Sequence, residues 1–333
     1  MNGTGVSVIL PAYNEELAIG SEVEAVRRAL TAADLLHEII VVDDGSRDRT
    51  VAEAIETGAR VLRHPENLGY GAAIKTGIGA ARYDTIVIID ADGTYPAERI
   101  PHLVARLEAA DMVVGARTGD RVEIPWLRRP AKWVLGWLAS RIAGRRIPDL
   151  NSGLRAFRRE CVKQYFSILS NRFSFTTTVT LAYLADEYRV VYEPIDYHRR
   201  LGRSKITPRH FMDFMILVLR MAMLFQPLRV FVPLAGGCAA AGGVKAVFDV
   251  FALFRRVPSW DGSLLYQPVL STSAILLFLV AFQLLMIGMV ADGVMRRIGQ
   301  HNRPLAPSYA TWSVEVLSEG RAEAPDVVAD IRK

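Results

Sequence analysis

The chain has 333 residues, of which 51% are hydrophobic, and a formal net charge of +5 at neutral pH. This length allows one large domain and a smaller part, and the hydrophobic share is high for a protein wholly in water, so we expect part of the chain in lipid. The chain has 2 cysteines, which are too few for a disulfide framework or a cysteine-rich zinc site, and this excludes a disulfide-stapled secreted scaffold.

The N-terminal segment MNGTGVSVILPAYNEE has no basic region, and its apolar run is short. A secretory signal peptide needs a positively charged start and a longer apolar stretch. We therefore expect residue 1 to lie in the cytosol.

Short β-rich runs alternate with helical segments in the first third of the chain. The predicted strands cover residues 6–10, 38–43, 60–64, 85–90 and 111–116. The predicted helices cover residues 15–33, 50–58 and 70–83. This alternation predicts right-handed βαβ crossovers and a mainly parallel sheet, which is an architecture typical of nucleotide-binding domains.

Two of these strands end in pairs of acids. The run EIIVVDDGSRD delivers Asp43 and Asp44, and the run IVIIDADGTYP delivers Asp90 and Asp92. Either pair alone fits an ordinary polar turn. Because the carboxyl ends of parallel strands form the ligand crevice of an open α/β sheet, we expect the four carboxylates at one edge. Closely spaced carboxylates of this kind suit a divalent metal that bridges a diphosphate.

The motif PAYNEE follows the first predicted strand and would face the same crevice. Its residues Pro11, Tyr13 and Glu15 could contact a nucleoside, with Tyr13 stacked on the base. The alternative is an ordinary turn from strand to helix in which Asn14 caps the helix.

The character of the chain changes after residue 206. Residues 207–226 predict an interfacial amphipathic helix. Two apolar segments, about 228–254 and 268–295, are each long enough to cross a bilayer and form a predicted transmembrane hairpin over residues 227–298. The remaining residues, 299–333, are expected to form a flexible cytosolic tail, and residues 1–206 form the expected catalytic domain.

Basic residues gather on one side of the two apolar segments. They are Arg199, Arg200, Arg203, Lys205, Arg209, Arg220 and Arg229 before the first, and Arg296, Arg297 and Arg303 after the second. The connecting loop has only Arg255 and Arg256. The positive-inside rule predicts a multi-pass protein of the inner or plasma membrane with the catalytic domain and both termini in the cytosol. This position makes lipid, and not nucleic acid, the expected partner.

Two features inside the first apolar segment leave alternatives open. Lys245 and Asp249 lie four residues apart and are either functional charges or a local ion pair. A cluster of glycines allows close helix packing and predicts a homo-oligomer, a dimer or tetramer, through the hairpin. These glycines are Gly236, Gly237, Gly242 and Gly243.

Seven motifs occur in the order found in family 2 glycosyltransferases of the GT-A fold. They are PAYNEE, VVDDGSRDRT, NLGYGAAIKTG, IIDADGTYP, VGART, DLNSGLRAF and RRLGRSK, within residues 5–206. The chain resembles in particular the polyprenyl-phosphate (dolichol-phosphate) glycosyl synthases with a membrane anchor of two spans. The resemblance implies an α/β fold with a Rossmann-like, mainly parallel sheet, followed by interfacial amphipathic helices and a transmembrane hairpin.

The resemblance also implies which residues form the site. The nucleotide sugar would contact Pro11, Tyr13, Glu15, Val42, Asp44, Asp90, Ala91, Asp92, Arg199 and Lys205. Asp90 and Asp92 would bind Mg²⁺ or Mn²⁺. The polyprenyl phosphate acceptor would contact Arg117, Arg129, Lys132 and Ser152. The catalytic residues would be Asp92, Asp149 and Arg117.

The implied reaction is an inverting displacement at the anomeric carbon of a nucleotide sugar. A phosphomonoester acceptor is mostly ionised at cytosolic pH, so positioned cations matter more than a strong general base. Asp149 in DLNSG matches the position of a base-like carboxylate in related inverting enzymes, and its alternatives are capping of a helix in NSGLRAF or orienting Arg155. Thr94 stands where mannose synthases of the family often have Gln, which puts mannose specificity in doubt.

A UDP-hexose, with UDP-glucose as its first candidate, is therefore the expected donor, and GDP-mannose is the alternative. Three rival functions are weaker. A processive polysaccharide synthase normally carries a Gln-x-x-Arg-Trp element and more spans. A dinucleotide-binding oxidoreductase would place its glycine motif after the first strand, whereas GYGAAI begins at residue 69. A non-catalytic membrane scaffold would not need the acid pairs.

Overall fold

The computed structural model describes residues 5–119, 136, 140, 144, 146–172, 174–198, 216, 219, 220, 223, 226–256, 269–301 and 315–318. The chain divides into two units. One comprises residues 1–218 with 303–333, and the other comprises residues 219–302.

The first unit alternates strands and helices as the sequence predicted. Its N-terminal elements are β1 (Val6–Ala12), α1 (Ile19–Ala32), β2 (His37–Asp43), α2 (Thr50–Glu56), β3 (Arg60–Arg63), α3 (Tyr70–Ala80) and β4 (Thr85–Ile88). They are followed by η1 (Ala97–Arg99), α4 (Ile100–Arg106), η2 (Leu107–Ala109), β5 (Met112–Ala116), β6 (Arg155–Arg158), α6 (Arg159–Lys163), α7 (Phe175–Ala185), β7 (Val190–Pro194) and β8 (Glu315–Ser318).

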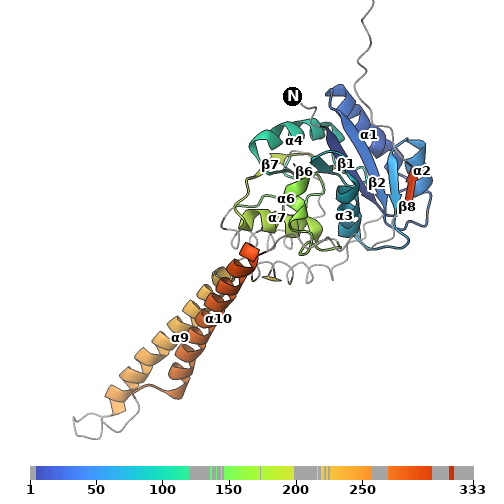
Figure 1. Ribbon diagram of the computed structural model, residues 1–333. Coiled ribbons are helices and arrows are strands. Elements are labelled where there is room, and N and C mark those ends of the chain that lie inside the picture. Colours follow the sequence, from blue (N-terminus) through green and yellow to red (C-terminus); the bar gives the residue numbers. More distant parts are fainter. Residues whose placement is uncertain are drawn as a thin grey trace, which may run out of the picture. The chain divides into compact units, whose positions relative to one another are not determined.

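The strands form one sheet in the order β7-β5-β6-β4-β1-β2-β3-β8. The pairs β1–β2, β1–β4, β2–β3 and β5–β7 are parallel, whereas β6 is antiparallel to β4 and β5, and β8 is antiparallel to β3. Helices α1 and α4 cover one face and α3 and α7 the other (Figure 1). The predicted fold, a mainly parallel α/β sheet, is thereby confirmed.

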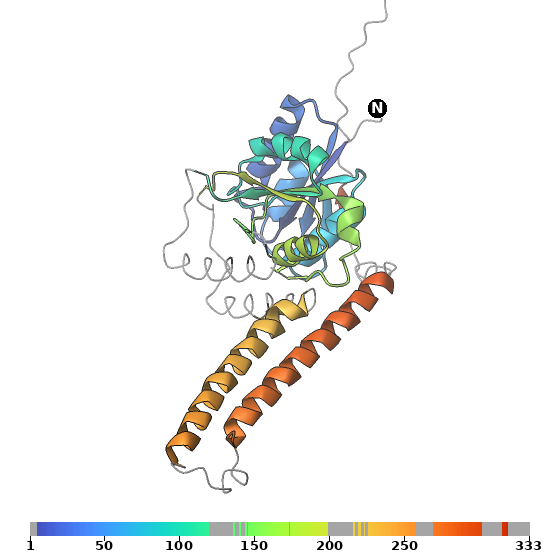
Figure 2. The ribbon, with the colours of Figure 1, turned by 90° about the vertical axis from the view of Figure 1, so that its left-hand side faces the viewer.

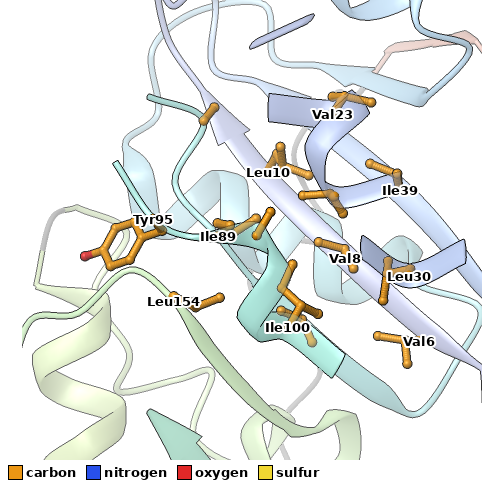
Figure 3. Close-up of a cluster of buried hydrophobic side chains, with 14 of the residues drawn as sticks. Val6, Val8, Leu10, Val23, Leu30, Ile39, Ile89, Tyr95, Ile100 and Leu154 are labelled. Carbon is orange, nitrogen blue, oxygen red and sulfur yellow. The ribbon is translucent and has the colours of Figure 1, made fainter. Parts of the chain in front are cut away.

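The hydrophobic core lies between the sheet and helices α1 and α4. Alternate residues of β1 point into it, namely Val6, Val8 and Leu10, because successive side chains of a strand face opposite sides. Val23 and Leu30 meet them from α1 (Figure 3). Tyr95, which follows β4, lies at the margin of this cluster with its hydroxyl directed away from the aliphatic side chains (Figure 3). The core therefore packs against a residue at the edge of the sheet where the parallel strands end.

Three strands of the described part of the chain were not predicted, namely β6, β7 and β8. The segment NSGLRAF, in which a helix was one alternative, instead contributes β6 at the centre of the sheet. The tail was expected to be flexible, but its residues Glu315–Ser318 form β8 on the edge of β3. The Ser318 hydroxyl accepts the backbone N–H of Val61 at 3.0 Å and donates to the carbonyl of Ala59 at 2.7 Å.

The second unit contains two long helices, α9 (Pro227–Arg256) and α10 (Thr272–His301), which lie side by side (Figure 2). Both are long and apolar enough to cross a membrane. Gly242 packs on Leu277 and Phe278, and a Cβ at Gly288 would lie 2.8 Å from Phe231, so two glycines let the helices approach closely.

Lys245 and Asp249 form a local ion pair within α9. Asp249 also accepts the backbone N–H of Ser271 at 2.9 Å and the hydroxyl of Ser271 at 2.5 Å. The pair therefore joins α9 to the start of α10. This favours a local ion pair over functional charges.

Candidate active site

The carboxyl ends of β1, β2, β4 and β5 lie at one edge of the sheet because these strands run in the same direction. Tyr13 and Glu15 follow β1, Asp44 follows β2, Asp90 and Asp92 follow β4, and Arg117 follows β5. The structure thus brings together the acid pairs and the arginine that the sequence predicted for one site.

Hydrogen bonds join the loop after β1 to the loop after β2. The backbone N–H of Asn14 donates to Ser46 Oγ at 2.9 Å, and that of Glu15 donates to Thr50 Oγ1 at 2.8 Å. The Asn14 side chain accepts the backbone N–H of Arg47 at 2.9 Å. Asn14 therefore joins two loops and does not cap α1, whose N-cap is Ala18.

Asp44 is held by three partners at the end of β2. Its Oδ1 accepts the backbone N–H of Leu68 at 2.9 Å and lies 2.8 Å from His64 Nδ1, and its Oδ2 accepts the backbone N–H of Gly69 at 2.9 Å. His64 is fully buried, and its Nε2 lies 2.9 Å from Thr76 Oγ1. The carboxylate thus organises the turn that leads into α3.

Asp90 and Asp92 are oriented by separate contacts. The Tyr70 hydroxyl donates to Asp90 Oδ1 at 2.7 Å. Asp92 Oδ1 accepts both the backbone N–H of Thr94 at 3.2 Å and the Thr94 hydroxyl at 2.6 Å. Thr94 therefore orients Asp92. Burial and then the charge of Asp90 raise the pKa of Tyr70 well above its usual value, so Tyr70 stays a donor.

Negative charge is concentrated at this edge. Burial, followed by the charges of Asp92 and Asp90, raises the pKa of Glu22 on α1 to about 8. No group of three or more His, Cys, Asp or Glu side chains suited to a metal occurs among the residues that the structure describes. Two carboxylates in a negative environment still fit a hard divalent cation whose remaining ligands are diphosphate oxygens and water.

The raised pKa of Glu22 predicts a pH-dependent stability. Between pH 4.5 and about 8 the unfolded chain carries an ionised Glu22 and the folded chain a protonated one, so folding takes up a proton and stability falls as the pH rises. Glu22→Gln should therefore gain about 4 kcal/mol over the wild type at pH 8 and almost nothing at pH 4.5. Denaturant unfolding with chelator present measures the difference, and an equal gain at both pH values would contradict the pKa assignment.

Arg117 and Asp149 form a buried bidentate ion pair. Arg117 Nε donates to Asp149 Oδ2 at 2.7 Å, its second guanidinium nitrogen donates to Oδ1 at 2.8 Å, and its backbone N–H adds a third bond at 3.0 Å. The guanidinium carbon lies 5.2 Å from the centre of the Tyr197 ring, and Tyr197 packs edge-on against Tyr95 at 5.3 Å. Asp149 therefore fixes Arg117, whereas the Arg155 guanidinium donates to Leu150, Ser152, Thr176 and Thr180.

Comparison with known proteins identifies the family of the chain. The family model for glycosyl transferase family 2 matches residues 7–166. An undecaprenyl-phosphate 4-deoxy-4-formamido-L-arabinose transferase from Pseudomonas aeruginosa (strain LESB58) is 31% identical over 302 residues, which cover 86% of this chain and 84% of that protein. The chain belongs to glycosyl transferase family 2. A transferase of the same name from Shewanella sediminis (strain HAW-EB3) is 32% identical over 264 residues, with 76% of each chain covered.

The fold of this glycosyltransferase is also that of solved structures. Glucosyl-3-phosphoglycerate synthase from Mycobacterium tuberculosis, in complex with Mn²⁺, UDP-glucose and phosphoglyceric acid, gives a TM-score of 0.54 at 22% identity. That comparison covers 66% of this chain and 80% of the synthase chain. The complex of the same synthase with phosphoglyceric acid alone gives a TM-score of 0.53 at 24% identity, again with 66% and 80% covered. The resemblance predicted from the seven motifs is confirmed, as is the prediction of an enzyme.

Several predicted site residues of this glycosyltransferase have other roles. Ser152 is 0% exposed and its hydroxyl donates to the carbonyl of Gly115 at 2.5 Å, so it is not placed to contact an acceptor phosphate. Val42 in β2 is 0% exposed, and Ala91 after β4 is also buried, so neither side chain faces the crevice openly. Pro11 is buried opposite Val42 in the pairing of β1 with β2. Four other predicted residues lie outside the described part of the chain, namely Arg129, Lys132, Arg199 and Lys205.

The sequence reasoning missed Tyr70, His64, Tyr197 and Gly153. Gly153 donates its backbone N–H to the Tyr95 hydroxyl at 2.7 Å, and a Cβ there would lie 2.2 Å from Asp90 Oδ2. The motif NLGYGAAIKTG drew attention to the Tyr70 segment, but nothing in it indicated a partner for Asp90.

The close approach at Gly153 predicts a specific defect. Gly153→Ala should displace Asp90 and lower the transfer rate about tenfold or more, because the added Cβ would push aside a carboxylate that is predicted to bind the metal. Gly20→Ala on α1 is the matched control, since a Cβ there meets nothing within 4 Å and should only favour the helix. Initial rates of sugar transfer measure both variants. Equal rates for Gly153→Ala and wild type would show that sugar transfer does not depend on the position of the Asp90 carboxylate.

Proposed function

We propose that this glycosyltransferase is anchored in the membrane and transfers a sugar from a nucleotide sugar to polyprenyl phosphate. The observation that carries the proposal is the position of the Asp90–Asp92 pair beside the Arg117–Asp149 pair at one edge of the sheet. The names of the relatives from Pseudomonas aeruginosa and Shewanella sediminis support a polyprenyl-phosphate acceptor.

The acidic and basic residues of the site have different proposed roles. Asp90 and Asp92 would hold Mg²⁺ or Mn²⁺ at the donor diphosphate, and the bound ion would stabilise the negative charge that develops on the leaving group. Arg117 is 16% exposed in its side chain, and Asp149 occupies only two of its five side-chain N–H groups. Arg117 can therefore orient a phosphate by further hydrogen bonds while Asp149 keeps it in place.

The acceptor supplies its own nucleophile. A phosphomonoester with a second pKa near 6 is mostly dianionic at cytosolic pH, so its oxygen can attack the anomeric carbon in line with the leaving diphosphate. Inversion at that carbon gives a lipid-phosphate-linked sugar. Arg199 and Lys205, and the pair Arg129 and Lys132, remain proposed contacts of phosphate groups.

The strand β8 supports the proposed topology. Residues before α9 and after α10 belong to the same sheet, so both ends of the helix pair lie on one side of any bilayer that the helices cross. With the excess of basic residues on that side, we place the catalytic domain and both termini in the cytosol. A homo-oligomer through the hairpin stays a prediction, and a Cβ at Gly236, Gly237 or Gly243 would meet nothing within 4 Å.

The donor is proposed as a UDP-hexose, with GDP-mannose as the alternative. The names of the relatives favour a second candidate, an activated 4-deoxy-4-formamido-L-arabinose. Purified full-length protein should be incubated with undecaprenyl phosphate and each radiolabelled nucleotide sugar, with undecaprenol as the control acceptor. We expect one labelled lipid product that requires the acceptor phosphate. Equal labelling of undecaprenol, or labelling of no lipid by any donor, would contradict the proposal.

A further inference from the structure

The first turn of α3 lies between the two acid pairs and is fixed from both sides. On the side of β2, Asp44 accepts the backbone N–H groups of Leu68 and Gly69, each at 2.9 Å. His64 fixes that carboxylate through Nδ1 at 2.8 Å, and its other ring nitrogen contacts Thr76 of α3 at 2.9 Å. A carboxylate only accepts, so His64 donates to Asp44 from Nδ1.

The segment before α7 fixes the same turn from the other side. The Lys75 ammonium donates to the carbonyl of Leu169 at 2.5 Å and to Asn171 Oδ1 at 2.8 Å. The backbone N–H of Ala72 donates to the carbonyl of Asn171 at 2.9 Å. A Cβ at Gly71 would lie 2.1 Å from the carbonyl oxygen of Ser170, so only glycine permits this approach.

These contacts on both sides of the turn place Tyr70 next to Asp90. Tyr70 follows Gly69 directly, and its hydroxyl donates to Asp90 Oδ1 at 2.7 Å. The other oxygen, Asp90 Oδ2, lies against Gly153. The orientation of the Asp90 carboxylate is thus set by Tyr70 on one side and by the backbone of Gly153 on the other.

We propose that Tyr70 is a positioning residue for the metal-binding carboxylate Asp90, and that the Gly69–Tyr70 step couples Asp44 and His64 to the metal site. This inference rests on the proposed function only in taking Asp90 as a metal ligand. The coupling is short, because Asp44 binds the backbone of Gly69 and the adjacent side chain binds Asp90.

The chemistry explains why the hydroxyl matters. A ligating carboxylate that is held by a hydrogen-bond donor presents a fixed oxygen to the metal, and loss of such a partner typically lowers metal affinity 10- to 100-fold. A change at His64 would loosen Asp44 and then the turn at Gly69, and this path reaches Asp90 through Tyr70. The two changes should therefore not act independently. Asp44 is also a predicted contact of the nucleotide, so Mn²⁺ binding is compared at saturating UDP or GDP.

The test measures Mn²⁺ binding to the full-length protein by electron paramagnetic resonance, with UDP or GDP present and no acceptor. Tyr70→Phe should weaken Mn²⁺ binding about tenfold, and His64→Gln should weaken it about threefold. The double variant should bind Mn²⁺ no more weakly than Tyr70→Phe. Thr76→Val is a milder variant that keeps both His64 and Asp44, and it should act in the same direction as His64→Gln. Tyr188→Phe is the control, since Tyr188 contacts Gln164 on the exposed surface, and it should bind Mn²⁺ as the wild type does.

Each outcome decides a different point. Unchanged Mn²⁺ affinity in Tyr70→Phe would overturn the positioning role. A double variant about 30-fold weaker than wild type would mean independent effects and would overturn the coupling. A wild type that binds no Mn²⁺ with either nucleotide would remove the metal assignment of the proposed function itself, and the inference with it.

Discussion

Replacing Asp92 with Asn should reduce sugar transfer roughly 100- to 1,000-fold while the protein still folds. The substitution removes the charge that would bind the divalent cation. It keeps an oxygen that can accept the backbone N–H and the hydroxyl of Thr94, which are the two hydrogen bonds of Asp92 Oδ1. Initial rates at saturating donor and acceptor, together with a thermal unfolding curve, measure the two effects separately.

Asp34→Asn is the matched control for this substitution. Asp34 is exposed at the end of α1 with a φ of 53°, a conformation that Asn adopts readily, so the exchange should leave both rate and stability unchanged. Full turnover in Asp92→Asn would refute the assignment of Asp92 to the metal.

Replacing Asp149 with Asn should produce the second large effect. The change leaves the buried guanidinium of Arg117 without its charged partner, and breaking a buried pair in this way costs about 3 kcal/mol or more. Because Arg117 would lose its fixed orientation, we expect the transfer rate to fall about 100-fold as well. Chemical denaturation and steady-state rates measure both losses.

The pH profile separates a positioning role of Asp149 from that of a general base. If the acceptor phosphate supplies the nucleophile, wild type and Asp149→Asn should share a rise in rate near pH 6, where the second phosphate ionisation occurs. If Asp149 were the base, this acid limb would change in the variant. A flat profile in Asp149→Asn would therefore restore Asp149 as a base.

The sequence predicted the first five strands because each is an apolar run that ends at a turn. It failed at β6, whose run RAFR has an arginine at each end. Arg155 is nevertheless fully buried there, because it donates to the carbonyls of Ser152 and Thr176 and to the Thr180 hydroxyl. Thr176 and Thr180 lie on α7, 21 and 25 residues after Arg155, so no local pattern could reveal these two partners.

The strand β8 was missed for a similar reason. Its four residues form too short a run to predict, and the hydrogen bond between Ser318 and Val61 joins positions 257 residues apart. The pairing exists because β3 would otherwise be an open edge of the sheet.

The sequence predicted the acids at the strand ends and not the contacts that orient them. The motifs identified Asp44, Asp90 and Asp92, since acids at strand ends form a recognisable pattern. The partner of Asp149 was not predictable, because Arg117 lies 32 residues before it in the chain. Tyr70 was missed in the same way, as its bond to Asp90 spans 20 residues.

The dependence of transfer on a divalent ion tests the central claim most directly. Full-length protein, freed of metal with excess EDTA, should be given undecaprenyl phosphate and the radiolabelled donor, and Mn²⁺ should then be added in steps. We predict no labelled lipid in chelator and recovery of the full rate as Mn²⁺ binds. Formation of the labelled lipid at the full rate in excess EDTA would contradict the account.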